Sequence, residues 1–135
     1  MPTKIFVNLP VKDLPRSTEF FTKLGFSIDK HYTDEKAGCV VISDDICAML
    51  LTEEFFQTFT TKELADARRS TEAIVALQVD SRQRVDELAD HALESGGSPA
   101  GEPMEQDGMY ERSFADLDGH LWEVFHMERA AVAAG

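Results

Sequence analysis

The sequence predicts an α+β fold made of two βαβββ modules. The first half has a strand-like segment, a capped helix, and strands that meet at the Asp44-Asp45 turn. The second half repeats this order and ends with strands that meet at Asp118-Gly119. This shared order of elements indicates an internal repeat.

The first module is expected at residues 1–52. Residues 4–11 alternate weakly between apolar and polar side chains, as a strand does, and Pro10 fits its end or a sheet edge. Asp13 is suited to cap a helix that ends at Gly25. The helix should direct Phe20, Phe21 and Leu24 to the core. The remaining strands are expected at Phe26–Thr33, Cys39–Ser43 and Ile46–Leu51.

A connector is expected at residues 53–72. Thr61 is suited to cap a short helix from Lys62 to Arg68. The connector also holds a dense aromatic group, made of Phe55, Phe56 and Phe59. We expect these rings to cover an edge of the core, while a lid over a pocket and a dimer contact are the alternatives.

The second module is expected at residues 73–127. It opens with a strand at 73–79, and Ser81 is suited to cap the helix that follows. Gly96-Gly97 should end this helix. One buried stripe is predicted from helical spacing at Val85, Leu88, Ala89, Ala92 and Leu93. The last two strands are expected at Met109–Ala115 and His120–Met127.

The charge of the chain limits its partners. Among its 135 residues, 13 are basic and 25 are acidic, which gives a net charge of −12. Such a balance disfavours nucleic acid and anionic membrane as partners. No apolar stretch reaches membrane-spanning length, and the opening "MPTKIFVNLP" has no long apolar region like that of a secretory signal. We therefore expect a cytoplasmic protein.

The two cysteines, Cys39 and Cys47, flank the Asp44-Asp45 turn. A two-residue turn would pair Cys39 with Leu50 and Cys47 with Ile42. Successive side chains of a strand point to opposite faces, so this register separates the two thiols. A disulfide is therefore not expected, which fits a reducing compartment.

Glu123 is a carboxylate within the apolar stretch "LWEVF" of the last strand. Because burial of a charge is costly, it should be a metal ligand, half of an ion pair, or a lone polar group in a cavity. A two-residue turn at Asp118-Gly119 would place Phe114 opposite Glu123 and Arg112 diagonal to it, close enough for an ion pair. Without a cation nearby, desolvation would raise the pKa of Glu123 and make it a candidate catalytic acid or base.

Strand parity also predicts which side chains share a cavity face with Glu123 or lie on the matching face of the first module. The predicted lining is apolar with a few polar points, as in small-molecule pockets. It consists of Phe6, Asn8, Cys47, Met49, Ile74, Ala76, Gln78, Tyr110, Arg112, Phe114 and Glu123.

Two motifs carry a family resemblance: "VNLPVKDLPRSTEFFTKLGF" near the start and "DLDGHLWEVF" near the end. Together they resemble the vicinal oxygen chelate superfamily, which includes glyoxalases, extradiol dioxygenases, and fosfomycin- and bleomycin-resistance proteins. The resemblance covers nearly the whole chain. It implies a single domain, residues 1–135, whose two modules form curved mixed sheets around a shared cavity, usually within a homodimer.

Metal-dependent members of that superfamily place their ligands on the first and last strands of each module. The resemblance carries these positions onto Phe6, Met49, Ile74 and Glu123. Only Glu123 suits a hard or borderline divalent metal, whereas catalytic zinc sites use about three protein ligands. We therefore expect no metal cofactor, unless the assumed register is wrong.

Three functions follow from this resemblance. The favoured one is metal-independent binding of a small apolar or aromatic molecule, as the bleomycin-resistance branch suggests. A metal-dependent lyase of the lactoylglutathione type, or an extradiol dioxygenase, would require a shifted ligand set. A non-catalytic partner-binding module would use the connector phenylalanines as its contact.

Overall fold

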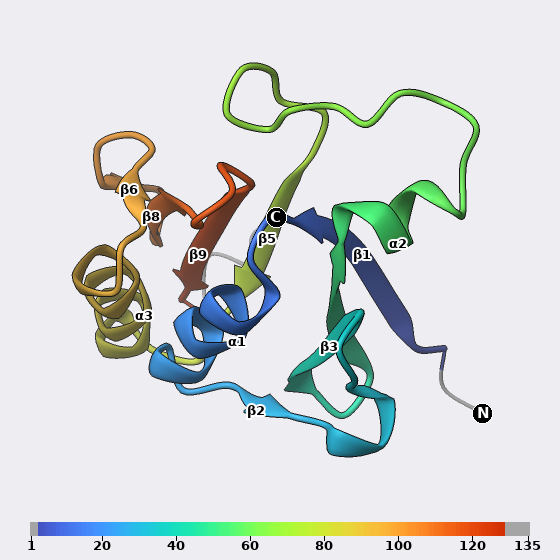
Figure 1. Ribbon diagram of the computed structural model, residues 1–135. Helices are drawn as coiled ribbons and strands as arrows, with labels where there is room; N and C mark the ends of the chain where they lie inside the picture. Colours follow the sequence, from blue (N-terminus) through green and yellow to red (C-terminus); the bar gives the residue numbers. More distant parts are fainter. Residues whose placement is uncertain (1–2, 129–135) are drawn as a thin grey trace. The chain divides into compact units, whose positions relative to one another are not determined.

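A computed structural model describes residues 3–128 of the chain (Figure 1). The chain divides into two compact units, Met1–Asp66 and Ala67–Gly135. Each unit has its own sheet and one long helix, which confirms the predicted α+β class. The unit boundary falls inside the predicted connector, so each unit is described by itself.

Unit 1 contains a four-stranded sheet in the order β1-β4-β3-β2. The edge strand β1 runs parallel to β4, and the other pairs are antiparallel. The elements in chain order are β1 (Ile5–Val11), α1 (Leu14–Lys23), β2 (Ser27–Ile28), η1 (Lys30–Tyr32), β3 (Ala37–Ser43), β4 (Ile46–Thr52) and α2 (Glu53–Gln57).

Helix α1 forms as its sequence predicts. The side chain of Asp13 caps it by accepting a hydrogen bond from the backbone N–H of Arg16. Gly25 has a φ of 103°, a left-handed conformation that glycine adopts without steric cost, so the chain turns there. The rings of Phe20 and Phe21 meet edge to face with centroids 5.0 Å apart, and both are buried.

Unit 2 contains a five-stranded sheet in the order β5-β9-β8-β6, with β7 also paired to β8. Its first strand again runs parallel to its last, as in unit 1, which supports the predicted repeat. The elements in chain order are β5 (Ile74–Gln78), α3 (Arg82–Glu94), β6 (Ser98–Pro99), β7 (Met104–Gln106), β8 (Met109–Ala115) and β9 (Leu121–Met127).

Helix α3 covers one face of this sheet, against β8 and β9 (Figure 1). Ser81 caps the helix by accepting from the N–H of Arg84, as predicted. Four residues of the predicted stripe are buried, namely Val85, Leu88, Ala89 and Ala92. Leu93 is 37% exposed, so it lies outside the buried stripe. The core of the unit also holds Phe114 stacked with Trp122 at 6.5 Å between ring centroids.

Two local predictions were wrong. Residues 62–68 do not form the helix expected after Thr61. The helix forms earlier, because Thr52 accepts from the N–H of Phe55 and the first turn carries two acidic residues that favour a helix N-terminus. The strand expected over 26–33 is also short, because the Asp29 side chain accepts from the N–H of His31 and begins the turn η1.

Candidate functional site

The sheet of unit 1 has one face against α1 and one face turned away from it. Val11, Ala48 and Leu50 are buried on the helix side. The parallel pairs Phe6–Cys47 and Asn8–Met49 therefore lie on the opposite face, because side chains alternate along each strand. These four predicted residues share a face, as the parity argument requires.

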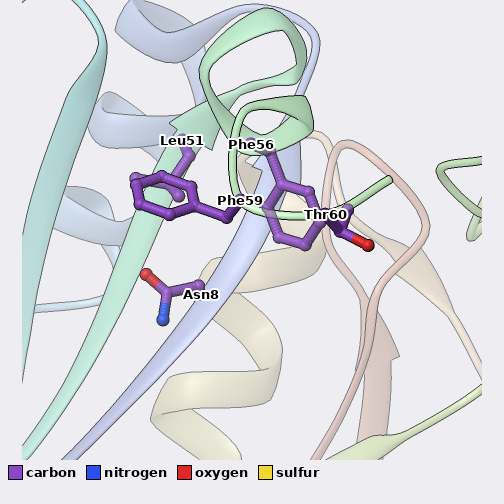
Figure 2. Close-up of a pocket in the computed structure, with 5 residues that line it drawn as sticks. All are labelled: Asn8, Leu51, Phe56, Phe59 and Thr60. Carbon is purple, nitrogen blue, oxygen red and sulfur yellow. The ribbon is translucent and has the colours of Figure 1, made fainter. Parts of the chain in front are cut away.

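A pocket of about 270 Å³ opens on this outer face of unit 1. It is lined by Asn8, Leu51, Phe56, Phe59 and Thr60. Phe56 lies in α2, which directly follows β4, and Phe59 lies just after α2. Figure 2 shows the rings of both residues near the side chains of Leu51 and Asn8.

Only Asn8 among these lining residues was predicted to face a cavity. Leu51 was missed although it pairs with Pro10, two positions from Asn8, and therefore shares its parity. The connector rings Phe56 and Phe59 line the pocket, which favours the pocket-lid alternative over a purely structural role. The sequence feature that could have indicated this wall is the dense group of phenylalanines directly after β4.

The sheet of unit 2 likewise has an outer face, turned away from α3. The parallel pairs are Ile74–Leu121, Ala76–Glu123 and Gln78–Phe125. Trp122 and Val124, which alternate with Leu121, Glu123 and Phe125, are both buried in the core. Glu123 therefore shares the outer face with Ile74, Ala76 and Gln78, as predicted.

The predicted register of the last hairpin was wrong. Ser113, and not Phe114, lies opposite Glu123, and Phe114 pairs with Trp122. The turn between the strands has three residues, 117–119, and not two. The N–H of Asp116 donates to the carbonyl oxygen of His120, so these two residues close the turn. One added turn residue moves every side chain of a strand to the other face.

The predicted cavity face consequently lacks three of its residues, namely Tyr110, Arg112 and Phe114. They lie on the helix side, where Phe114 is buried in the core. The Tyr110 hydroxyl donates to Asp86 at 2.6 Å, and Arg112 Nη1 lies 3.1 Å from Asp86 and 2.9 Å from Asp90. The expected Glu123–Arg112 ion pair is therefore wrong, since Arg112 is paired with helix α3.

Glu123 has a second carboxyl group as its neighbour. Glu111 pairs with Phe125, which places it diagonal to Glu123 on the outer face. Burial raises the pKa of Glu111, and the negative charge of Glu123 and a hydrogen bond between the two side chains raise it further. Sequence reasoning missed Glu111 because its face depends on the length of the turn.

The predicted register of the two cysteines was also wrong, although no disulfide joins them, as expected. The register of β3 and β4 shifts between Val41 and Ser43, so Cys39 pairs with Met49 and Val41 pairs with Cys47. This bulge inserts one residue and reverses the expected parity. Both thiols are free and lie on the same outer face. Burial raises the pKa of Cys39 to about 11, with a further contribution from Cys47.

The side chains present do not fit the divalent metal centre of the metal-dependent superfamily members. The transferred positions offer Phe6 and Met49 in unit 1, and Ile74 and Glu123 in unit 2. Within residues 3–128, no group of three or more histidine, cysteine, aspartate or glutamate side chains is arranged to hold a metal ion. His126 is used elsewhere, since its Nδ1 lies 3.1 Å from the carbonyl oxygen of Val79.

Known structures share this architecture. The hypothetical protein SA1046 from S. aureus is 30% identical, with 93% of this chain and 95% of that chain covered and a TM-score of 0.79. A glyoxalase/bleomycin resistance protein/dioxygenase family enzyme from Burkholderia phytofirmans PsJN is 16% identical, with 91% and 97% covered and a TM-score of 0.75.

FosX, a genomically encoded fosfomycin resistance protein from Listeria monocytogenes solved with Mn(II) and sulfate, is 19% identical. The match covers 97% of this chain and 94% of that chain, with a TM-score of 0.68. No curated protein matches the sequence. A family model matches residues 5–124, nearly the whole chain, and the protein therefore belongs to the Glyoxalase/Bleomycin resistance protein/Dioxygenase superfamily.

Proposed function

We propose that this protein binds a small, largely apolar or aromatic molecule on the outer face of a sheet without a divalent metal. The observation that carries the proposal is the chemistry of the four transferred ligand positions. Phe6 and Ile74 have no coordinating atom, and the thioether of Met49 prefers soft metals. The same side chains suit contact with an apolar ligand.

Each outer face has polar side chains that would orient a ligand bound on it. The face of unit 1 has Asn8, and the face of unit 2 has Gln78 and the Glu111–Glu123 pair. A few polar groups in an apolar lining are typical of small-molecule sites. Because the chain carries a net charge of −12, a ligand with a positively charged group would be favoured over an anionic one.

Glu123 is the residue that we propose for proton transfer, if the bound molecule is also transformed. Its carboxyl partner Glu111 has a raised pKa, so the pair holds a proton at a higher pH than an isolated glutamate would. In a turnover assay, Glu123→Gln should then lose activity while it keeps ligand affinity. Loss of affinity alone would reduce Glu123 to a binding role.

The proposed function is tested by thermal unfolding with a library of small aromatic and apolar compounds, each measured with and without a chelator. Some compounds should raise Tm equally in both conditions, and elemental analysis of the purified protein should find no stoichiometric metal. A metal that copurifies one to one, or a chelator that lowers Tm and abolishes binding, would instead support a metal-dependent lyase or dioxygenase.

We further propose that the protein works in the cytoplasm as a homodimer. Both sheets leave an edge strand with exposed apolar side chains, Ile5 and Phe6 on β1 and Ile74 on β5. Apolar edge strands are normally covered by a partner or another element. Within residues 3–128, no helix is long and apolar enough to span a membrane.

A further inference from the structure

We infer that the pocket of unit 1 takes a planar aromatic ring that carries an N–H or O–H donor, and that the side-chain oxygen of Asn8 recognises this donor. The inference rests on the proposed function, because it names the ligand class of one binding face. It concerns unit 1 alone and leaves the outer face of unit 2 unassigned.

The size and walls of the pocket favour a flat ring. Its volume is about 270 Å³, whereas an apolar protein cavity of about 150 Å³ accommodates benzene. Phe56 and Phe59 supply aromatic walls, and Leu51 beside them is only 3% exposed. Aromatic rings prefer stacked or edge-to-face partners, so one ring or two fused rings match these walls in size and chemistry.

Asn8 supplies the direction of polar recognition. Its Nδ2 donates to the carbonyl oxygen of Phe6 at 3.3 Å, which orients the amide. In Figure 2 the amide oxygen points to the side of the Phe59 ring, and the nitrogen points away from it. No donor within residues 3–128 reaches this oxygen, so the pocket presents an acceptor that a ligand N–H or O–H can satisfy.

Thr60 completes the rim, and its hydroxyl and carbonyl oxygens already accept hydrogen bonds. Its hydroxyl oxygen accepts from the N–H of Lys62 at 3.1 Å, and its carbonyl oxygen accepts from Gln57 Nε2 at 3.0 Å. Gln57 Nε2 also donates to the carbonyl oxygen of Lys62 at 2.9 Å. These bonds hold the segment after α2 in place, so the wall is built before a ligand arrives and less ordering is needed on binding.

Phe59 is the part of the wall that gains most from a ligand. It is 68% exposed, although it meets the Phe55 ring edge to face with centroids 5.1 Å apart. A ring bound between Phe59 and Asn8 would remove apolar surface of Phe59 from water, which stabilises the complex.

Indole and benzofuran form a matched pair of probes, because they have nearly the same shape and only indole has an N–H donor. Calorimetric titration of the intact protein should show tighter binding of indole, by roughly three- to tenfold, which is the contribution of one net hydrogen bond. Asn8→Leu should bind both probes alike, whereas Asn8→Asp keeps an acceptor and should keep the preference.

Phe59→Ala should weaken the binding of both indole and benzofuran. Tyr32→Ala is the control for this substitution. Tyr32 is also an aromatic residue of unit 1, is 67% exposed, and is not among the pocket residues. Circular dichroism of each variant checks its fold. A loss of affinity in Tyr32→Ala as large as in Phe59→Ala would mean that the effect is not specific to the pocket and would overturn the inference.

Two other outcomes would overturn the inference and leave the proposed function intact. One is equal affinity of the wild-type protein for both probes. The other is a library compound that binds with unchanged affinity to Phe59→Ala, while neither probe binds the wild type. If no compound in the library binds and neither probe does, both the inference and the proposed function fail.

Discussion

Asp116 is the residue that shapes the last hairpin. It is only 6% exposed, and its carboxylate accepts three hydrogen bonds. Oδ1 accepts from the N–H groups of Asp118 and His120, and Oδ2 accepts from Trp122 Nε1, each at 3.0 Å. Burial raises the pKa of Asp116, whereas these donors and the nearby His120 act in the opposite direction. One side chain thus links the turn to the core.

We expect Asp116→Ala to destabilise the protein by roughly 2–4 kcal/mol, because three donors lose their acceptor, two of them in buried surroundings. Urea unfolding followed by circular dichroism measures this change. Asp44→Ala, in the exposed turn of the first hairpin, should change stability by less than about 0.5 kcal/mol. Equal effects of the two substitutions would contradict the role of the Asp116 bonds.

The raised pKa of Glu111 predicts that the stability of the folded protein depends on pH. Its pKa is raised in the folded protein, chiefly by burial and then by Glu123. At a pH below the unfolded-state pKa, Glu111 is protonated in both the folded and the unfolded state and does not reduce the stability of the protein. As pH rises from there through the folded-state pKa, the folded state retains the proton longer and stability is lost.

Glu111→Gln should therefore raise Tm at pH 7 and have a smaller effect at pH 4. Relief of a cross-strand repulsion contributes up to about 1 kcal/mol. Glu87→Gln removes one negative charge from an exposed position on α3 and should not show this pH dependence. Thermal unfolding at both pH values compares the variants, and a lower Tm for Glu111→Gln at pH 7 would show that the pair is not repulsive.

At the scale of elements, the loop between β8 and β9 packs against the end of the connector. Gly119 has a φ of 90°, and a Cβ atom there would lie 2.9 Å from the backbone nitrogen of Arg68 and 3.0 Å from the carbonyl carbon of Ala67. Arg68 Nη2 also donates to the carbonyl oxygen of Leu117 at 2.8 Å. The loop therefore requires glycine both for its conformation and for this close approach.

Gly119→Ala should be more destabilising than Gly108→Ala, which is its matched control. Gly108 has a similar φ of 81°, but no atom of residues 3–128 stands close to a Cβ added there. Both substitutions carry the left-handed penalty of about 1–2 kcal/mol, and only Gly119→Ala adds a backbone clash. Chemical denaturation measures the difference, and equal losses would mean that the connector does not pack on the loop.

At the scale of the whole molecule, the chain combines two units of the same design with a strongly acidic composition. Each unit leaves an apolar edge strand, and in both units the first strand pairs in parallel with the last. The proposed homodimer would cover part of this apolar surface, while the net charge of −12 limits further association.

Light scattering coupled to size exclusion should accordingly give twice the mass of one chain. Ile74→Lys, on the edge strand β5, should shift the protein toward the monomer, because a lysine on an edge strand opposes pairing. Glu87→Lys, which introduces a lysine at an exposed position of α3, should leave the mass unchanged. A wild-type protein that is monomeric at micromolar concentration would remove the homodimer from the proposal.

Much of the fold was determined by short-range features of the sequence. The caps at Asp13 and Ser81 place α1 and α3, because their side chains satisfy N–H groups within the same turn. The strand patterns place β8 at its predicted bounds and β9 within one residue of them. These features depend on neighbours three or four residues away, so they can be read from the chain alone.

The tertiary structure decided which side chains share a face. The hydrogen bonds between Asp116 and residues 118 and 120 close a turn of three residues, and the bulge at Ile42 adds one residue to β3. Because side chains alternate along a strand, each of these single-residue changes reversed a predicted face. For this reason Arg112 lies on the helix side and not on the outer face, where Glu111 lies instead. The bulge likewise places Cys39 on the same face as Cys47. Likewise, only the packing of α2 against β1 and β4 made Phe56 and Phe59 walls of a pocket.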